Sequence, residues 1–599
     1  MIKSDTIFPT YNARHYAPKE VAETFIWSES FSKLIQNNHS VILGARGCGK
    51  TTLMKMLTLP ALNSWKSERA ENIKKQIPFY AIYISTDIYW DVKNHTYNEQ
   101  LKKFGNFSEI ISRFSVNTNV FISLCDTFLN ILELEINNSD EEKEYELGKV
   151  LIEAWKLPKT IPKIKYIKEE LNKRVDEVNQ MIQNIIFNYK KDDNLPHYDY
   201  FNLSFVTSIE SIIPTFERIY DIVDVKKWAL CFDELEFAPL WLQSELFESL
   251  RSRKHYILYK LSASPILSSE LENCLKGTYR ATTGNDYELI KMWNSSDYKE
   301  FSISLITSLL KKKYPEADPI SYFESNEVYN KESDSYEKGS DFYKQMLDLI
   351  KKDESFKNFL KEKKVKITNP VPINEGQKDT LFRKIKPIVY YRNFFIESNK
   401  YSNGKLTVKY RSRKSSNFLS GIEVLSEICD GNPRWLIGLT NSILIKSDIK
   451  SAKSSTQYSE LYLIAQKFKN VINNIPVGEN NKLSIMDIID KIALFFRDQI
   501  LGNQFKMDPK GTFIVDEKEN LIPNHIIDLI EKGISQGAFI LIDTNDDAFD
   551  FEIRNQRIKL SYLFFVLYDL PIRKFGEISL SRCLKGTDLS NINQMSLFE

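Results

Sequence analysis

Three groups of residues in this chain have types and spacings that could do chemistry together. The first is Gly44-Ala45-Arg46-Gly47-Cys48-Gly49-Lys50-Thr51, which matches the pattern G-x-x-x-x-G-K-[ST]. In this pattern backbone N–H groups surround phosphates, the lysine reaches the β- and γ-phosphates, and the hydroxyl ligates Mg²⁺. The apolar residues 41–43 predict a buried strand before it, and residues 52–57 predict the start of a helix after it. We therefore expect the phosphates of ATP to be bound by Gly44, Ala45, Arg46, Gly47, Cys48, Gly49, Lys50, Thr51 and Thr52.

The second group supplies the acidic residues that such a loop needs. Residues 228–232 are continuously apolar, as in a parallel strand buried on both faces, and Asp233 and Glu234 follow directly. Ligands of open α/β sheets lie at the carboxyl ends of the strands. We expect Asp233 to hold Mg²⁺ through water and Glu234 to polarise the attacking water, which predicts ATP hydrolysis to ADP and phosphate. A solvated acidic turn is the alternative.

The third group is polar residues after the next strand, which is predicted at 256–261. Ser262 is our candidate for a residue that senses the γ-phosphate, with Ser264 as the runner-up, and the alternative for either serine is a turn cap. Further strands are predicted at 79–85 and 287–293. Five strands around these motifs indicate one doubly wound α/β domain with parallel strands.

Composition restricts the kind of protein that carries these motifs. The 599 residues suggest about four compact units. With 81 Lys and Arg against 80 Asp and Glu, the net charge of +1 excludes a polybasic binder, so any nucleic-acid surface must be a local patch. Six cysteines without paired C-x-x-C spacing exclude a disulfide scaffold. Without a signal pattern or an apolar run of membrane-spanning length, we expect a soluble, cytoplasmic protein with no membrane contact.

At this point the chain resembles the AAA+ ATPases of the origin-recognition and replication-initiator type, and more narrowly their prokaryotic branch found in anti-phage defence loci. The residues that carry the resemblance are Asn12-Ala13-Arg14, 20–25, 44–51, Asp233-Glu234-Leu235-Glu236 with Pro239, Leu250-Arg251-Ser252 and Gly431-Asn432-Pro433-Arg434. The resemblance implies an AAA+ (ASCE) P-loop NTPase core with a helical lid, helical insertions and a C-terminal winged-helix-like domain. It also implies ATP and Mg²⁺ as cofactors.

In such ATPases an arginine on the lid touches the nucleotide, and Arg434 fits that position. Pro433 after Gly431-Asn432 predicts a helix with proline in its first turn. A guanidinium at this helix start can report the γ-phosphate, whereas a solvated arginine on a capping turn is the alternative. Arg251 or Arg253 is a weaker candidate for an arginine finger supplied to a neighbouring subunit.

The remaining sequence divides into recognisable segments. We expect an N-terminal segment at 1–40, the core at 41–296 with a helical insertion at about 101–202, and the lid at 297–475 with a basic insertion at about 314–420. A winged-helix-like domain at 480–575 and a flexible tail at 576–599 follow. An apolar stripe on one long helix, Ile164, Ile167, Leu171, Val175, Val178, Ile182 and Ile185, marks the first insertion as an interaction arm or as an extra layer on the core.

Two segments bear on DNA. Residues 405–414 hold five cations and no acid, and alternation predicts one strand face with Lys405, Thr407, Lys409, Arg411 and Arg413, and Tyr410 opposite. This is the best nucleic-acid patch, with a charge-protected edge strand as the alternative. Residues 480–575 predict helices at about 484–501 and 523–536 and strands at 538–542 and 549–553. The hairpin tip at 543–550 holds four aspartates, so we expect protein contact there, or DNA contact only through Arg554, Arg557 and Lys559.

The last residues, Gln594-Met595-Ser596-Leu597-Phe598, resemble peptides that dock on a replication sliding clamp, although such a tail can also fold back on its own protein. The function we expect is an ATP-hydrolysing switch in DNA-linked anti-phage defence, acting through nucleotide-controlled self-assembly or activation of an effector protein. The alternatives are a replication initiator or clamp-associated loader, and a nucleotide-gated scaffold with little turnover.

Overall fold

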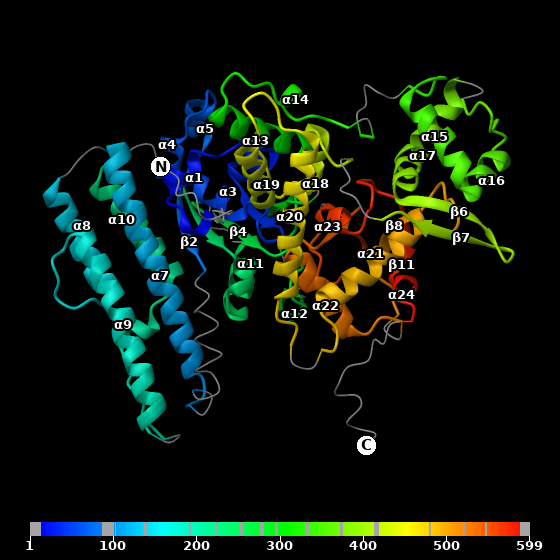
Figure 1. The fold of residues 1–599 in the computed structure, drawn as a ribbon. Helices are drawn as coiled ribbons and strands as arrows, with labels where there is room; N and C mark the ends of the chain where they lie inside the picture. Colours follow the sequence, from blue (N-terminus) through cyan, green and yellow to red (C-terminus); the bar gives the residue numbers. More distant parts are fainter. Residues whose placement is uncertain are drawn as a thin grey trace, which may run out of the picture.

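A five-stranded parallel sheet carries the phosphate-binding loop (Figure 1). In the order of the sheet the strands are β2 (Phe79–Ser85), β3 (Lys227–Asp233), β4 (Ile257–Ala263), β1 (His39–Leu43) and β5 (Tyr287–Lys291). All five strands lie where the sequence predicts them, to within a few residues at their ends. Because β4 lies between β1 and β3, it separates the strand that precedes the loop from the strand that ends at Asp233.

The computed structural model describes residues 13–86, 101, 104–136, 140–190, 193–222, 226–251, 256–275, 281–293, 297–326, 328–329, 335–371, 375–412, 418–478, 481–518, 521–544 and 548–586. No helix among these residues is long and apolar enough to span a membrane.

Helices cover both faces of the parallel sheet, and strand alternation decides which face each side chain joins. Ile42, Ala81, Cys231 and Leu258 point to one face. That face is covered by α1 (Pro18–Ala22), α2 (Glu29–Leu34), α3 (Lys50–Met56), α4 (Leu59–Ser64) and α5 (Ala70–Gln76). The opposite face is covered by α7 (Phe107–Ile131), α8 (Glu141–Ala154), α9 (Ile164–Asn188), α10 (Phe205–Ile219), α11 (Leu240–Ser249) and α12 (Ser269–Leu275).

The first insertion packs on the sheet as an extra helical layer and also extends beyond it as an arm. The upper parts of α7 and α9 and all of α8 and α10 join the apolar core of the sheet. The lower ends of α7 and α9 extend beyond the sheet and share a separate small core (Figure 1). The predicted apolar stripe on α9 is present with one change. Val175 is only half-buried, and the neighbouring Arg174 takes the buried position between Leu171 and Val178. The Arg174 guanidinium donates to the carbonyls of Trp155 at 2.8 Å and Lys156 at 2.6 Å.

The second half of the chain shares one continuous apolar core. A helical group that we call the lid consists of α13 (Tyr298–Lys313), α18 (Ile422–Ile428), α19 (Pro433–Lys446) and α20 (Ser454–Asn473). Inserted in the lid are α14 (Pro319–Tyr322), α15 (Asp341–Lys352), α16 (Glu354–Glu362), α17 (Glu375–Phe395), and a two-stranded antiparallel hairpin of β6 (Ile396–Ser402) and β7 (Lys405–Tyr410).

The C-terminal module, residues 481–586, is built around a four-stranded sheet of order β11-β8-β10-β9. Its elements are α21 (Ile485–Leu501), β8 (Lys510–Ile514), α22 (Asn524–Ser535), β9 (Phe539–Ile542), β10 (Arg557–Leu560), α23 (Tyr562–Leu567), β11 (Gly576–Ser579) and α24 (Leu580–Cys583). The two predicted helices and the strand at 538–542 are present. The assignment as a winged helix stays a prediction.

The predicted strand at 549–553 is wrong, because β10 forms at Arg557–Leu560 instead. The alternating aromatic residues of the segment pack on the five-stranded parallel sheet rather than within a hairpin. Phe549 stacks on Tyr287 of β5 with ring centroids 5.4 Å apart. Asp550 forms a buried ion pair with Lys291 at 2.6 Å and its carbonyl accepts from the N–H of Leu267 at 3.0 Å. The segment is therefore a docking contact.

The two aspartates in the described part of 543–550 both form ion pairs, one at an exposed position and one buried. Asp543 pairs with Arg557 at 2.8 Å and Asp550 is buried, while residues 545–547 lie outside the described residues. The three cations proposed for DNA make contacts within the chain. Arg557 also donates to Thr512, Arg554 donates to the carbonyls of Asp516 and Ile522, and Lys559 is buried against Asp430.

Candidate nucleotide-binding site

The loop of residues 44–49 joins β1 to the N-terminus of α3 in a shape that suits phosphate. Gly47 and Gly49 have φ values of +86° and +107°, which side chains rarely tolerate. Close approach adds a second requirement at Gly47, since a Cβ there would lie 3.0 Å from Asn432 Oδ1 and 3.1 Å from Arg434 Cβ. The helix that begins at Lys50 directs its first N–H groups toward the space above the loop.

Lys50 is buried beside the carboxylate of Glu236, a residue that the family resemblance includes without a role. Its Nζ donates to the carbonyl of Gly44 at 2.5 Å and lies 3.7 Å from Glu236 Oε1. Burial by itself lowers the pKa of Lys50, but the charges of neighbours, first of all Glu236, raise it overall. Lys50 is therefore a cation already paired with an anion, and a phosphate would replace that carboxylate.

Asp233, at the end of β3, is held in place from two neighbouring strands. Its Oδ1 accepts from Ser262 Oγ of β4 at 2.5 Å, and its Oδ2 accepts from Tyr83 Oη of β2 at 3.1 Å. Ser262 also accepts from the N–H of Glu234 at 3.0 Å. Ser262 thus lies at the acidic pair, whereas Ser264 donates to the carbonyl of Ile266. The hydroxyl of Ser262 therefore orients the Asp233 carboxylate and the backbone N–H of Glu234.

Glu234 occupies a left-handed backbone conformation with φ of 58°, between β3 and the short 3-10 helix Leu235–Phe237. Its carboxylate pairs with Arg14 at 3.2 Å, and Arg14 also donates to the carbonyl of Thr86 at 3.2 Å. Burial, followed by the charge of Asp233, raises the pKa of Glu234, while Arg14 opposes that rise. The Glu234 carboxylate is therefore restrained by a cation from the N-terminal segment.

Arg14 reaches this place because α3 anchors the segment that carries it. Arg14 belongs to the 3-10 helix Ala13–His15, whose carbonyls accept from the buried Lys55 of α3. Lys55 also donates to the carbonyl of Tyr16 at 2.8 Å. Arg14 is among the residues that carry the family resemblance, but the resemblance assigns it no role. No spacing rule links residue 14 to residue 234.

The lid closes over the loop through the predicted turn at 431–434. As predicted, Pro433 begins α19, and the Asn432 side chain caps it by accepting from the N–H of Arg434 at 3.1 Å. The Asn432 amide also donates to the carbonyl of Arg46 at 3.1 Å. The structure therefore brings Arg434 against Gly47 of the phosphate-binding loop. Burial lowers the pKa of Arg434, and the nearby charge of Arg46 lowers it further.

The C-terminal module also contacts the loop, and no pattern in the sequence predicts this contact. The N–H of Arg46 donates to the carbonyl of Ser535, at the end of α22, at 2.8 Å. Behind the lid turn, Asp430 accepts hydrogen bonds from Lys559 and from Ser561 Oγ at 2.8 Å. The loop, the lid turn and the C-terminal module therefore form one three-way contact.

A pocket adjoins the loop and has the lining that a nucleoside needs. It lies between the N-terminal segment, α13 and the start of α19, and it is lined among others by Phe25, Ile26, Ser28, Thr52, Asp297, Tyr298, Pro433 and Ile437. Apolar walls with a few polar groups suit a flat base and a ribose. Together with the glycine loop and Lys50, these residues fit ATP, and Thr51 and Asp233 provide the oxygen ligands that suit Mg²⁺.

Some residues with a predicted function do not lie in this candidate site. Arg251 follows α11 at an exposed position, and Arg253 lies outside the described residues, so the arginine finger stays a prediction. The clamp-like residues Gln594–Phe598 also lie outside the described residues.

A glycine loop between a strand and a helix, with an acidic pair at the end of a neighbouring parallel strand, defines a P-loop NTPase. The family model described as ORC-CDC6-like matches residues 6–580, and the chain belongs to this family. Membership implies the AAA+ fold and nucleotide binding, typically with Mg²⁺. No curated protein and no solved structure matches the chain.

Proposed function

We propose that this protein is an ATP-hydrolysing AAA+ switch. The observation that carries the proposal is the convergence of Lys50, Asp233 and Glu234 from two parallel strand ends, with Arg434 of the lid packed on the same loop. These groups come from separate elements, so the arrangement depends on the whole sheet. A lid that touches the loop can change its position when the loop is filled.

The chain's own groups would act in sequence. Lys50 exchanges Glu236 for the β- and γ-phosphates, and the N–H groups of the loop and of α3 surround them. Mg²⁺ bound at Thr51 and Asp233 would neutralise phosphate charge. Ser262 keeps Asp233 oriented, and Glu234 polarises the attacking water once its carboxylate leaves Arg14.

Two variants separate binding from turnover. Lys50→Ala should reduce ATP affinity about 100-fold or more, because Lys50 contacts phosphate in the ground state. Glu234→Gln should keep affinity within about threefold and lose turnover about 100-fold, because the carboxylate acts mainly on the attacking water. Titration with a fluorescent ATP analogue and a phosphate-release assay measure both, and Lys75→Ala, at an exposed position on α5, is the matched control. Undiminished hydrolysis in both site variants would overturn the assignment.

The Arg14–Glu234 ion pair favours a second candidate, the nucleotide-gated scaffold that binds ATP and turns it over little. A carboxylate engaged by a guanidinium at 3.2 Å is a poor base for water. Single-turnover hydrolysis distinguishes the two functions. A rate below about one event per hour that no partner raises would favour the scaffold.

The setting that we propose is DNA-linked anti-phage defence, with nucleotide-controlled self-assembly or activation of an effector protein, and this part depends on the family resemblance. A replication initiator or clamp-associated loader uses the same site and is the alternative. Native mass measurement with ADP and with a slowly hydrolysed ATP analogue tests the assembly step. An unchanged mass would remove self-assembly from the proposal. A separate titration of a labelled 585–599 peptide with a sliding clamp tests whether the tail binds the clamp.

A further inference from the structure

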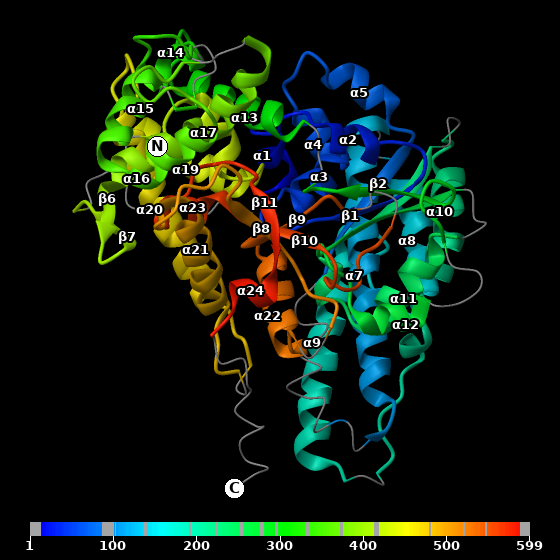
Figure 2. The same cartoon turned by 90° about the vertical axis from the view of Figure 1, so that its right-hand side faces the viewer.

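The insertion in the lid carries an excess of positive charge that the rest of the chain lacks. Residues 341–412 contain 17 Lys and Arg against 8 Asp and Glu, which gives +9 in a protein whose total is +1. Figures 1 and 2 both place the hairpin of β6 and β7 at the end of the molecule away from α8 and α10. The basic charge is therefore concentrated at one end of the molecule.

The pairing register of the hairpin divides its side chains between two faces. Asn399 pairs with Val408 and Tyr401 with Leu406, and this inner face lies on α16, where Asn358 contacts Tyr401 at 3.3 Å. The alternate residues form the outer face: Ser398, Lys400, Ser402, Lys405, Thr407 and Lys409. All of them except Ser398 are exposed. The described part of the hairpin holds one acid, Glu397, which pairs with Lys409 at 3.0 Å.

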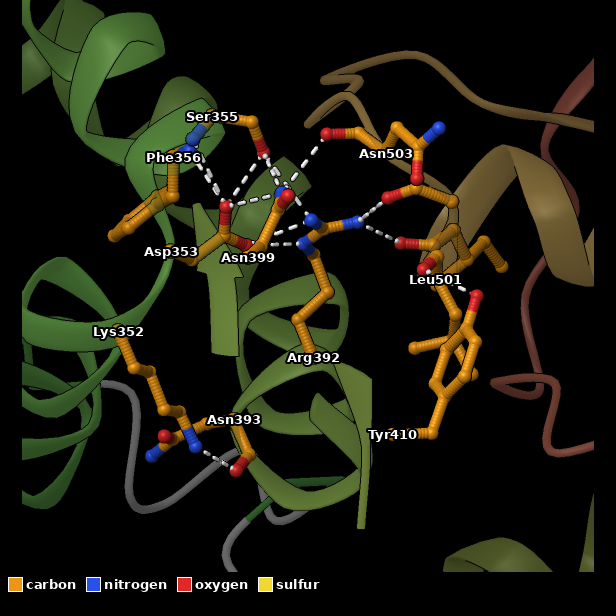
Figure 3. Close-up of polar contacts among 12 residues, drawn as sticks. Lys352, Asp353, Ser355, Phe356, Arg392, Asn393, Asn399, Tyr410, Leu501 and Asn503 are labelled. Carbon is orange, nitrogen blue, oxygen red and sulfur yellow. Dashed lines mark hydrogen bonds and ion pairs between the residues drawn. The ribbon is translucent and has the colours of Figure 1, made fainter. Parts of the chain in front are cut away.

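A buried polar network locks this hairpin to the C-terminal module (Figure 3). Arg392, at the end of α17, pairs with Asp353 at 2.7 Å and donates to the carbonyls of Ile500 and Gly502 at 2.8 Å each. These carbonyls lie at the end of α21, where a cation is favourable. Asn399 of β6 donates to Asp353 at 2.9 Å and to the carbonyl of Asn503 at 2.8 Å.

This buried network gives the outer face a fixed position. Arg392, Asp353 and Asn399 are each fully buried. Moving the hairpin would therefore expose the charges of Arg392 and Asp353 or leave them buried without their partners. Tyr410 adds a contact outside the network, since its hydroxyl donates to the carbonyl of Leu501 at 3.1 Å. A two-stranded ribbon held in this way projects its basic face as a rigid element.

We propose that the outer face of the β6–β7 hairpin binds double-stranded DNA. Lys400, Lys405 and Lys409 would contact phosphates on the two sides of the major groove, which is wide enough for a two-stranded β-ribbon. Arg411, which is exposed directly after β7, extends the same positive surface. The major groove of A-form RNA is too narrow for such a ribbon, so the geometry favours DNA.

Two observations distinguish this surface from a charge-protected edge strand. The end of α16, which packs on the hairpin, and the residues after it add four exposed lysines, Lys361, Lys363, Lys364 and Lys366, against one exposed acid, Glu362. Edge protection needs no such extension. In addition, the cations of the C-terminal module that the sequence suggested for DNA are engaged inside the protein. The proposal adds a partner to the switch and does not depend on ATP hydrolysis.

The test uses the full chain and a fluorescent 30-base-pair DNA duplex between 50 and 200 mM salt, with and without ATP. A hairpin variant carries Lys400→Glu, Lys405→Glu and Lys409→Glu. The control variant carries Lys159→Glu, Lys165→Glu and Lys173→Glu on the first insertion, where all three lysines are also exposed. We expect the hairpin variant to lose at least tenfold in affinity at 100 mM salt. Its slope of log affinity against log salt should fall by about 3, since each phosphate contact contributes about 0.9.

The control variant should stay within about twofold of the parent, and both variants should keep the parent's melting temperature. Equal losses in the two variants, or unchanged binding by the hairpin variant, would overturn the proposal. A parent protein that fails to bind the duplex at 50 mM salt would do the same. Equal binding of a duplex RNA with the same sequence would overturn the major-groove placement.

Discussion

At the scale of single residues, the side chain of Arg434 is the link between the lid and the phosphate-binding loop. Arg434→Ala should reduce the preference for ATP over ADP about tenfold and change ADP affinity by less than about threefold. A charge-assisted hydrogen bond to the γ-phosphate is lost, whereas the cradle around the other phosphates remains. Parallel titrations with ATP and ADP measure this, with exposed Arg69→Ala, before α5, as the control for loss of a guanidinium. Unchanged discrimination would leave Arg434 as a packing residue only.

Arg14 has the opposite role, because it restrains the carboxylate of Glu234, the group that we propose polarises the attacking water. Arg14→Ala should raise basal turnover a few-fold at pH 8 and leave ATP affinity unchanged. The guanidinium lowers the pKa of Glu234, so its removal lets burial and Asp233 raise that pKa further. Because the base must be ionised, the acidic limb of the rate profile should move to higher pH. Arg14→Lys, which keeps the charge, should show a smaller shift, and identical profiles for all three proteins would contradict this role.

At the scale of elements, a buried lysine ties the central strand β4 to the start of β1. Lys260 Nζ donates to the carbonyls of Gln36 at 2.9 Å and Asn38 at 2.6 Å, and to Ser40 Oγ at 3.0 Å. Burial lowers the pKa of Lys260 from its ordinary value to about 7. Between that value and about 10.5 the unfolded chain binds the proton more tightly, so this residue adds stability as the pH rises.

The stability of the parent protein relative to Lys260→Met should therefore depend on pH. Between pH 7 and 9 the difference should move in favour of the parent by about 1.4 kcal/mol per pH unit. Below pH 7 the difference should be constant, because Lys260 is then protonated in both states. Melting temperatures of the two proteins across this range measure the trend. A difference that stays level from pH 7 to 9 would show that Lys260 is charged in the folded protein.

At the scale of the whole molecule, two buried ion pairs dock the C-terminal module beside the nucleotide site. Lys291 of β5 pairs with Asp550, and Lys559 of β10 pairs with Asp430 behind the lid turn. Each pair joins regions that lie far apart in sequence. The module is thus placed where a change at the loop reaches it directly, through Arg46 and Ser535.

Breaking one of these pairs should loosen the docking. Asp550→Asn leaves the buried ammonium of Lys291 without its carboxylate, which costs about 3–5 kcal/mol. We expect a lower melting temperature and faster proteolysis between residues 543 and 556. Asp508→Asn removes a carboxylate of similar type from an exposed pair with Lys384 and should change neither measurement. Equal behaviour of the two variants would mean that the Lys291 contact does not hold the module.

Much of the five-stranded parallel sheet follows from local sequence. Buried parallel strands are continuous apolar runs, so all five strands and the helix after Lys50 were predictable, as was the start of α19 at Pro433. The positions of Lys50, Asp233 and Glu234 followed with them, because strand ends converge in a doubly wound sheet. These features depend on local patterns of a few neighbouring residues, and such patterns can be identified in a single sequence.

The tertiary structure alone decided which distant groups meet at the site. No sequence spacing predicts the contact of Arg14 with Glu234 or the contact of Arg46 with Ser535. Each contact joins elements that are brought together only by packing. The same reason explains the strand wrongly predicted at 549–553. Alternating aromatic residues satisfy a strand and a docking segment equally well in sequence. The choice between them depends on burial against β5, where Phe549 meets Tyr287 and Asp550 meets Lys291.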